Sequence, residues 1–348
     1  MSGWEQRWAA RATIARAPGD EGLFLALAPM DGVTDWVFRG LVTGQFGARS
    51  GISLCVSEFV RVTTQVPPAA VLLRHCPELS RGGVTEGGVP VFVQILGGDA
   101  EPMAGTARLA ASLGAPGVDI NFGCPSRKVN KRDGGATLLK YPERLRAIVA
   151  AVRDAVPPEI PVSAKIRVGW ADDDDLETIV RAAGAGGASW ITIHARTRIQ
   201  GYKPPVRWRA LARTVGLTGA TVVANGDLNT VEDLGACAEQ SRCQAFMIGR
   251  GAMSAPDLFA RARGARDREL ELGDFIELWR EYYARLIADG AAEIKAISRV
   301  KQWLRFASPG SPAIASLFDA FKTLREWERG DALLSLALES PERLGIEL

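Results

Sequence analysis

The chain has 348 residues, of which 47% are hydrophobic and 24% charged, a composition typical of a soluble globular protein with a sizeable core. A formal net charge of +2 excludes nucleic-acid binding through a generally basic surface, so any RNA partner would have to meet a local patch of cations. No apolar run approaches the ~18 residues of a membrane span, and the five cysteines contain no C-x-x-C pair and are too sparse for a disulfide framework, which favours a cytoplasmic protein that meets no membrane.

Residues 1–22 form a segment without a clear secondary-structure pattern. Tryptophans and arginines are scattered there among alanines, and a break at Pro18-Gly19-Asp20 follows. The segment lacks the apolar centre of a secretory signal peptide. We expect an N-terminal extension that is disordered, and we assign no function to it.

Apolar, β-favouring runs recur eight times from residue 23 onward, separated by intervals of roughly helical length. The runs are residues 23–30, 54–60, 90–96, 118–124, 161–168, 190–195, 220–225 and 245–249. Several intervals have helical patterns, as at 142–156, 174–183 and 230–239. Eight such β–α units predict a TIM (β/α)8 barrel over residues 23–263. A doubly wound sheet is the weaker alternative, because residues 248–254 only approach a G-x-G-x-x-G fingerprint.

The strand pattern ends near residue 263, and residues 264–348 show helical periodicity instead. Helices are expected at 274–287, 291–306, 312–329 and 332–338, which predicts a C-terminal helical-bundle domain. Four cations surround the apolar stripe of the second helix with no acid among them: Lys295, Arg299, Lys301 and Arg305. On charge alone, a solvated helix flank explains this 295–305 cluster equally well.

The fourth run ends in a turn, Gly123-Cys124-Pro125, which places a thiol at the carboxyl end of a strand, where barrel enzymes do their chemistry. The loop that follows carries four cations, Arg127, Lys128, Lys131 and Arg132. A lone cysteine is more often a buried small hydrophobe than a catalyst. No second histidine at a strand end is present to activate it, which disfavours a cysteine protease. With an ordinary pKa of ~8.5, the thiol could act as a proton donor.

Other strand ends carry cations and glycines. They are Lys165 and Arg167 on the fifth strand, His194 on the sixth, Asn225-Gly226-Asp227 after the seventh, and Gly249-Arg250-Gly251 after the eighth. Glycines after strands seven and eight let backbone N–H groups approach a phosphate. A lysine within a barrel strand is seldom packing alone, because burying its charge unpaired is costly. His194 taken alone fits a core histidine as well as a ligand. The set as a whole suits an anionic, electron-accepting cofactor with a phosphate tail, and FMN fits.

Seven segments, in order and at matching spacing from about residue 23 onward, resemble the tRNA-dihydrouridine synthase family. They are APMDGVTD (28–35), SEF (57–59), VQILG (93–97), DINFGCPS (119–126), KIR (165–167), IHART (193–197) and IGRG (248–251). EFVRV (58–62) and RVKQWL (299–304) resemble the members that modify uridine 16 of the D-loop. The chain departs from the family pattern at Ala195, where glycine is usual, and in its N-terminal extension.

The resemblance implies an enzyme that binds FMN over the barrel mouth, reduces it with NADPH, and reduces the C5=C6 bond of uridine in tRNA. Hydride would pass from the flavin to C6, and Cys124 would protonate C5 from the opposite face. The implied cofactor contacts are Pro29, Met30, Asp31, Gln94, Lys165, His194, Asn225, Gly226, Asp227, Gly249 and Arg250. The implied contacts to uracil and tRNA are Asn121, Arg167, Arg61, Arg299, Lys301, Lys322 and Phe306, with the helical domain as a second, tRNA-binding jaw. We expect a monomer that needs no metal.

Two other functions stay open from the residues alone. A free-pyrimidine enzyme such as a dihydroorotate dehydrogenase also uses an FMN barrel, but it requires neither the helical domain nor the 295–305 cluster. An RNA-binding module with an inactive barrel is disfavoured, because Cys124, Lys165 and Asn121 are all present. A flavin absorption band would separate this module from both enzymes.

Overall fold

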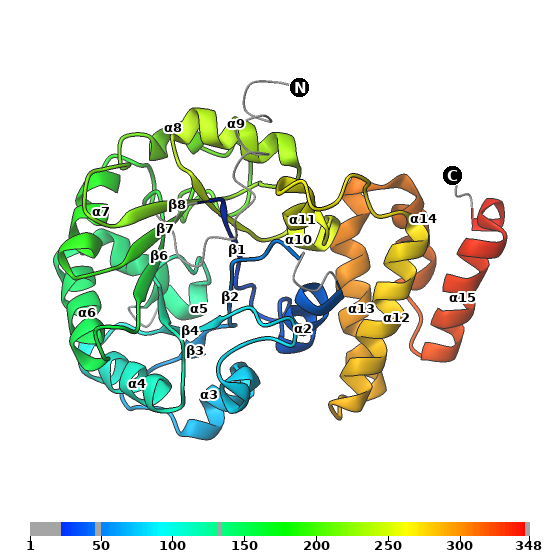
Figure 1. The fold of residues 1–348 in the computed structure, drawn as a ribbon, viewed down its shortest axis with the longest axis horizontal. Helices are drawn as coiled ribbons and strands as arrows, with labels where there is room; N and C mark the ends of the chain where they lie inside the picture. Colours follow the sequence, from blue (N-terminus) through cyan, green and yellow to red (C-terminus); the bar gives the residue numbers. More distant parts are fainter. Residues whose placement is uncertain (1–21, 46–49, 131–133, 345–348) are drawn as a thin grey trace.

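The computed structural model describes residues 22–45, 50–130 and 134–344 (Figure 1). All but the last residue of the extension predicted at 1–22 lies outside the described residues, as do Lys131 and Arg132 of the cationic loop. Within the described part of the chain, no helix is both long enough and apolar enough to cross a membrane.

Eight parallel strands of the described chain form a closed barrel, and each lies within one of the eight predicted runs. They are β1 (Phe24–Leu27), β2 (Leu54–Val56), β4 (Val91–Leu96), β5 (Val118–Asn121), β6 (Val162–Arg167), β7 (Trp190–His194), β8 (Thr221–Asn225) and β9 (Ala245–Ile248). Pairing of β9 with β1 and of β2 with β4 closes the ring. A short strand, β3 (Val60–Arg61), extends β4 on one side. The predicted TIM barrel is therefore confirmed.

Helices surround the barrel on its outer face (Figure 1). The longer ones are α2 (Trp36–Gln45), α3 (Ala69–His75), α4 (Ala100–Ser112), α6 (Pro142–Ala155), α7 (Leu176–Ala185) and α9 (Val231–Ser241). Shorter helices are η2 (Pro77–Arg81), α5 (Arg127–Asn130), η3 (Gly135–Lys140), α8 (Trp208–Leu211), α10 (Gly251–Ser254) and α11 (Leu258–Ala262). The helical patterns read at 142–156, 174–183 and 230–239 correspond to α6, α7 and α9.

Alternation along the strands divides the barrel into two cores. Leu25 and Leu27 of β1 face the helices, whereas Phe24 packs inside the barrel, its ring centroid 6.2 Å from that of Trp190. Apolar rings fill the amino-terminal half of the interior, where Phe92 lies 5.3 Å from Trp190. Gly117 makes room for them, because a Cβ there would lie 2.1 Å from the Phe92 ring. Polar inward side chains begin directly above these rings, with Ser163 and Asp119, and continue to the carboxyl end.

Four further helices follow α11 in the described chain. They are α12 (Leu272–Ala288), α13 (Glu293–Ala307), α14 (Pro312–Phe321) and α15 (Trp327–Glu339), with the short turns η4 (Ser308–Gly310) and η5 (Pro341–Leu344). The single helix expected at 312–329 is wrong, since α14 ends at Phe321 and α15 runs through Gly330. A Cβ at 330 would lie 2.8 Å from the Phe321 ring, so glycine there allows the two helices to pack closely and does not end α15.

The C-terminal helices pack against one side of the barrel (Figure 1) through buried aromatic residues. The Trp303 indole on α13 donates to the Met253 carbonyl (2.9 Å), and its ring lies 4.8 Å from that of Phe38 on α2. On α12, the Tyr282 hydroxyl donates to Asp35 Oδ2 (2.9 Å). These contacts attach the helices directly to the segment that follows β1. The domain boundary near residue 263 stays a prediction.

Candidate active site at the carboxyl end of the barrel

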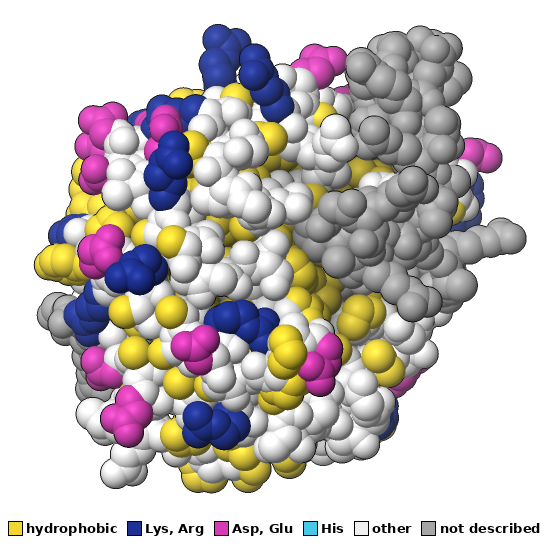
Figure 2. All heavy atoms as spheres, turned by 60° about the vertical axis from the view of Figure 1, so that its left-hand side comes forward, with side chains coloured by type: hydrophobic (Ala, Val, Ile, Leu, Met, Phe, Trp, Pro, Cys, Tyr) yellow, Lys and Arg dark blue, Asp and Glu magenta, His cyan; other side chains and the backbone are white. Residues whose placement is uncertain are grey.

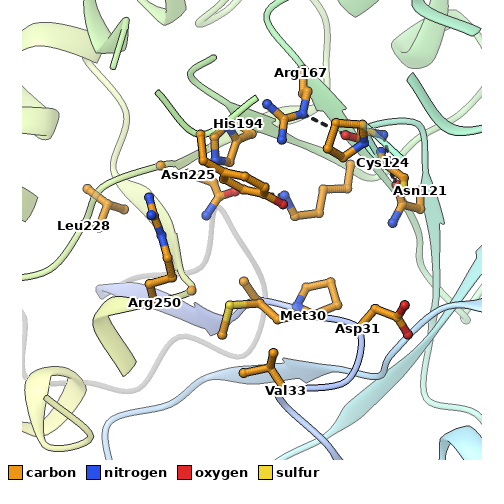
Figure 3. Close-up of a pocket in the computed structure, with 18 of the residues that line it drawn as sticks. Met30, Asp31, Val33, Asn121, Cys124, Arg167, His194, Asn225, Leu228 and Arg250 are labelled. Carbon is orange, nitrogen blue, oxygen red and sulfur yellow. Dashed lines mark hydrogen bonds between the residues drawn. The ribbon is translucent and has the colours of Figure 1, made fainter. Parts of the chain in front are cut away.

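A cavity of about 430 Å³ opens at the carboxyl ends of the strands (Figure 3). Figure 3 shows Met30 and Val33 on one side and Asn121, Cys124 and His194 on the other. The sequence-predicted residues that line it are Pro29, Met30, Asp31, Gln94, Asn121, Cys124, Lys165, Arg167, His194, Asn225, Gly226, Asp227, Gly249, Arg250 and Phe306. Residues far apart in the sequence therefore meet at one site, as expected where parallel strands end together.

The turn that carries Cys124 is held by side-chain contacts from its own strand. Asn121 Oδ1 accepts hydrogen bonds from the backbone N–H groups of Gly123 and Cys124, both at 3.0 Å. Gly135 packs beneath the turn with φ of +61°, and a Cβ there would lie 3.1 Å from Cys124 Cβ. Burial raises the pKa of the Cys124 thiol, and the charges of Arg167 and Arg61 offset this only partly. The thiol is therefore protonated at neutral pH.

Lys165 lies inside the barrel with its ammonium directed at Asn225. Its Nζ donates to Asn225 Oδ1 (2.8 Å), while Asn225 Nδ2 donates to the Met247 carbonyl (2.7 Å). Burial lowers the pKa of Lys165 to about 8, although the negative charge of Asp119 opposes this. Lys165 thus stays cationic at neutral pH, half-buried in the wall of the cavity.

Asp119 was missed as a functional candidate by the sequence analysis. It lies on β5, 1% exposed, and accepts hydrogen bonds from Gln94 Nε2 (2.7 Å) and Ser163 Oγ (2.6 Å). Burial raises its pKa to about 6, against those two hydrogen bonds and the charge of Lys165. Strand alternation could have indicated it, since residues 119 and 121 of one strand face the same side.

Arg167 connects the Cys124 turn to the loop after β7. Its Nε donates to the Gly123 carbonyl (2.8 Å), and Nη1 donates to the carbonyls of Thr197 (3.0 Å) and Gly201 (2.7 Å). The guanidinium also lies 5.2 Å from the ring of Tyr202, an exposed residue of the cavity wall that the sequence analysis did not single out. Arg167 thereby fixes the turn and the wall relative to each other.

His194 presents an unsatisfied ring nitrogen. Its Nδ1 is buried and has no hydrogen-bond partner among the described residues. Burial lowers the pKa of His194 well below its ordinary value, and the surrounding cations, Arg167 foremost, lower it further. A neutral imidazole with a buried, unsatisfied nitrogen is costly in a finished protein. This atom is therefore suited to hold a ligand atom.

The loops after β8 and β9 meet beside His194. Arg196 and Arg250 both donate to the Asp227 carboxylate, with Arg250 Nη2 2.7 Å from Oδ1. Burial acts to raise the pKa of Asp227, but these two arginines outweigh it and lower that pKa. Gly251 permits the close approach of the loops, because a Cβ there would lie 2.1 Å from the Leu228 carbonyl oxygen. Neutral imidazole, glycine backbone and guanidinium together form a donor set that fits a phosphate group.

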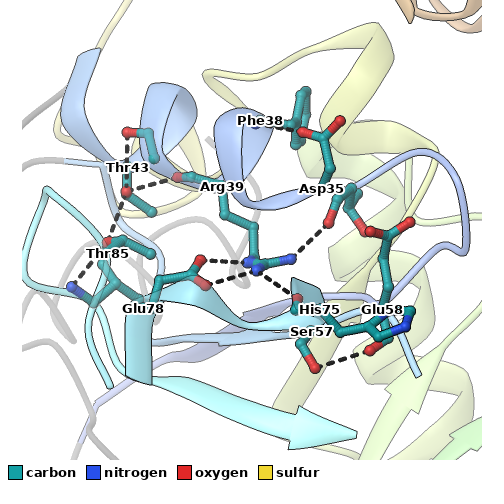
Figure 4. A network of polar contacts seen from close by, with 12 residues as sticks. Asp35, Phe38, Arg39, Thr43, Ser57, Glu58, His75, Glu78 and Thr85 are labelled. Carbon is teal, nitrogen blue, oxygen red and sulfur yellow. Dashed lines mark hydrogen bonds and ion pairs between the residues drawn. The ribbon is translucent and has the colours of Figure 1, made fainter. Parts of the chain in front are cut away.

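The segment that carries Pro29, Met30 and Asp31 is supported from behind by a buried polar network (Figure 4). Arg39, fully buried, donates to both carboxylate oxygens of Glu78 (2.8 and 2.9 Å) and to the Thr34 carbonyl (2.8 Å). The Gly32 N–H also donates to Glu58, and the Phe38 N–H donates to Asp35 (2.9 Å). The second wall of the cavity is therefore rigidly held.

The residues predicted to contact RNA separate into two groups. Arg61 is close enough to lower the pKa of the thiol, and Phe306 on α13 reaches the cavity wall. Arg299 Nε instead lies 3.5 Å from Asp35, Lys301 donates to the Leu324 carbonyl, and Lys322 forms an exposed ion pair with Asp319 (2.6 Å). Of the 295–305 cluster, Arg299 therefore has an acid beside it that the local sequence does not show, while Lys301 meets an uncharged carbonyl. On the face in Figure 2, cations and acids are likewise interspersed.

The substitution at Ala195 leaves the cavity unobstructed. Ala195 is fully buried in the core between barrel and helices, and its N–H donates to the Asn225 carbonyl (2.8 Å). The extra methyl group relative to glycine therefore packs outside the site.

Comparison with known proteins agrees with this geometry. The sequence pattern of the family described as "Dihydrouridine synthase (Dus)" matches residues 26–331. A tRNA-dihydrouridine(16) synthase of Aquipseudomonas alcaligenes is 41% identical over 90% of this chain and 99% of its own length. One of Pseudomonas putida is 40% identical (90% and 96%), and one of Ralstonia nicotianae 41% (87% and 92%).

Solved structures resemble the chain in fold. A 2-naphthoyl-CoA reductase complex matches with a TM-score of 0.52 at 14% identity, covering 70% of this chain and 50% of its own. The structure of TcOYE with pHBA matches with a TM-score of 0.50 at 13% identity, covering 74% and 94%. At such low identity, both similarities concern the barrel alone.

Proposed function

The chain belongs to the dihydrouridine synthase family, and from this premise we propose that it reduces uridine 16 in the D-loop of tRNA to 5,6-dihydrouridine. Relatives named tRNA-dihydrouridine(16) synthases cover about nine-tenths of the chain at about 40% identity, which supports both the reaction and the position. The observation that carries the proposal is the pairing, in one cavity, of a protonated thiol on Cys124 with the Lys165 ammonium and the unsatisfied nitrogen of a neutral His194.

The residues of that wall fit FMN. Lys165 would hold the pyrimidine edge of the ring, with Gln94 beside it. The phosphate and ribityl chain would meet His194, Asn225, Gly226, Asp227, Gly249 and Arg250, and the opposite wall would be Pro29, Met30 and Asp31. When bound, reduced FMN would supply the hydride for C6 of uracil, and NADPH would reduce the oxidised flavin again.

Cys124 would supply the second hydrogen, as a proton. Its raised pKa keeps the Sγ–H bond intact until the uracil is bound. Donation of this proton to C5 then completes the addition of one hydride and one proton across the C5=C6 bond. The thiolate left behind lies in the field of Arg167 and Arg61, which stabilises it until it is protonated again from solvent. Asn121 and Arg167 would hold the uracil edge during the reaction.

The substrate base has to leave its stack, because cofactor and thiol must face opposite sides of one ring. A cavity at the mouth of a closed barrel admits a single extruded base and excludes one that is still stacked. Phe306 reaches this cavity from the C-terminal helices. The helices would therefore grip the folded RNA as a second jaw and set which base enters.

The test is dihydrouridine mapping of tRNA from cells that lack the protein, together with reconstitution. Purified protein, FMN, NADPH and unmodified tRNA should yield dihydrouridine at position 16, and a transcript with cytidine there should yield none. Product only at position 17 or 20 would overturn the site assignment. Reduction of free uracil or orotate without any RNA would favour the free-pyrimidine enzyme instead.

A further inference from the structure

Asp119 is a buried carboxylate for which the proposed reaction has no use. It lies on β5 two residues before Asn121, and it is not among the residues that line the cavity. Burying a charged group costs free energy unless it is paired and hydrogen-bonded. Its contacts are specific, however, since each carboxylate oxygen receives its own hydrogen bond, Oδ2 from Gln94 and Oδ1 from Ser163.

The hydrogen bonds from Asp119 to the cavity run in a single direction. Asn121 Oδ1 accepts from the N–H groups of Gly123 and Cys124, which can only donate, so the Asn121 amide has only one possible orientation. Its Nδ2 then donates to Gln94 Oε1 (2.8 Å), and Gln94 Nε2 donates to Asp119 Oδ2 (2.7 Å). The two amide side chains, Asn121 and Gln94, therefore lie between backbone donors at one end and a carboxylate acceptor at the other, and this arrangement determines which way each amide is turned.

We propose that Asp119 is a positioning residue: by accepting from Gln94 Nε2, it holds Gln94 in the orientation in which Oε1 receives Asn121 Nδ2 at the reaction site. The inference rests on the proposed function, because Gln94 and Asn121 are assigned there to the flavin and to uracil. Without an acceptor at 119, Gln94 could turn its carbonyl inward and present the wrong atom to the cofactor. The pKa of about 6 leaves Asp119 ionised at neutral pH, so that both of its oxygens can accept a hydrogen bond.

Three variants separate orientation from mere burial. Asp119→Leu keeps the shape but removes the acceptor. Asp119→Asn removes the charge but can keep the direction, with its carbonyl toward Gln94 and its NH₂ toward the Ser163 hydroxyl. Ser163→Ala is the matched control, because it deletes a hydrogen bond to the same carboxylate (2.6 Å) without touching Gln94. All assays are run at neutral pH, where Asp119 of the wild type is ionised, and Asp119→Asn controls for the loss of negative charge beside Lys165.

The first readout is the affinity of the FMN-free protein for FMN, followed by flavin fluorescence. The second is the rate of uridine reduction in a single turnover. We expect Asp119→Leu to lower both by about 10- to 100-fold, as for a buried donor left unsatisfied. Asp119→Asn and Ser163→Ala should stay within about threefold of wild type in both readouts, a smaller change than the loss expected for one buried, unsatisfied donor. Unchanged values for Asp119→Leu, or an equal loss in Ser163→Ala, would overturn the proposal.

An exchange of the acid and the amide between positions 119 and 94 tests the proposal if Asp119→Leu does not fold. Gln94→Glu places a carboxylate against Asp119, and adding Asp119→Asn restores a matched donor and acceptor. The double variant should melt at a higher temperature than Gln94→Glu alone, without any flavin present. Equal melting temperatures would overturn the contact. Wild-type protein that binds no FMN and leaves tRNA unchanged would overturn the proposed function, while the exchange still reports on the orientation.

Discussion

Replacing Cys124 by alanine separates proton donation from every other step. The variant should bind FMN and accept electrons from NADPH as wild type does, because none of the described hydrogen bonds of Lys165, His194 and Asp227 involves the Cys124 sulfur. Uridine reduction should fall, since C5 would lose its proton source. The thiol is only partly buried, so the protein should fold normally.

The size of the effect follows from what surrounds the thiol. Loss of a general acid typically costs ~10²–10⁴-fold in rate. His194 is held in its neutral form, and Lys165 already donates to Asn225 from the cofactor side, so neither can readily replace the thiol. We therefore expect the upper half of that range, a loss of ~10³–10⁴-fold, which corresponds to ~4–5.5 kcal/mol of activation free energy.

The assay is a stopped-flow single turnover. Enzyme reduced anaerobically with NADPH is mixed with unmodified tRNA, and the return of the oxidised-flavin band is recorded with dihydrouridine in the product. Because burial raises the pKa of Cys124, the wild-type rate should hold through neutral pH and fall only on the alkaline side. The residual rate of Cys124→Ala should lack the part of that fall that follows the thiol, while any part that follows Lys165, whose pKa is about 8, should remain.

The matched control is Cys243→Ala, which removes a buried thiol remote from the cavity. It should lose some stability and keep full activity. If Cys124→Ala turns over tRNA at the wild-type rate, the proton comes from elsewhere. If it slows flavin reduction by NADPH to the same extent, Cys124 serves cofactor binding and the assignment is equally refuted.

Four further outcomes are expected. The purified protein should be yellow with tightly but noncovalently bound FMN, and colourless, folded protein that takes up no added FMN would contradict the cofactor. The double variant Arg299→Ala/Lys301→Ala should bind tRNA more weakly and reduce the salt dependence by up to ~0.9 log units per lost phosphate contact on the duplex scale, with NADPH-driven flavin reduction as the unaffected control. Arg39→Met should lower the free energy of unfolding by ~3–5 kcal/mol, because it leaves buried Glu78 uncompensated, and adding Glu78→Met should restore much of it in denaturant titrations. Between the ordinary pKa of an aspartate and about 6, Asp119 keeps its proton in the folded protein but loses it in the unfolded chain. The free energy of unfolding should therefore fall as pH rises through this window. Melting temperatures of Asp119→Asn measured across the same window should lack this part of the fall.

The barrel could be predicted from sequence because each strand is a short apolar run that the fold requires. The meeting of the candidate site residues could be predicted for the same reason, since the carboxyl ends of parallel strands converge and bring Gln94, Asn121, Lys165 and His194 to one cavity. Convergence depends only on strand position. The types of these residues then indicate the chemistry without any knowledge of loop conformation.

Contacts between distant segments could not be predicted in this way. Arg299 looked like a free cation because its helix carries no neighbouring acid, yet Asp35 lies 3.5 Å away after a chain separation of the whole barrel. The break between α14 and α15 depends on the Phe321 ring against Gly330, and on Trp327 stacked 3.7 Å from Tyr283. None of these pairings leaves a periodic signal in the sequence.

The attachment of Phe306 and Trp303 has a consequence for how such enzymes can be recombined. The Phe306 carbonyl accepts from Ser254, the Trp303 indole donates to Met253, and Tyr282 donates to Asp35, so the helices complete a wall that the barrel begins. A chimera that exchanged everything after α11 with a relative of different target position would put all three contacts at risk, because each joins an exchanged helix to a retained segment. The unit to transplant is therefore the helices together with Asp35, α2 and α10, and a change of target base requires matched changes on both sides of this interface.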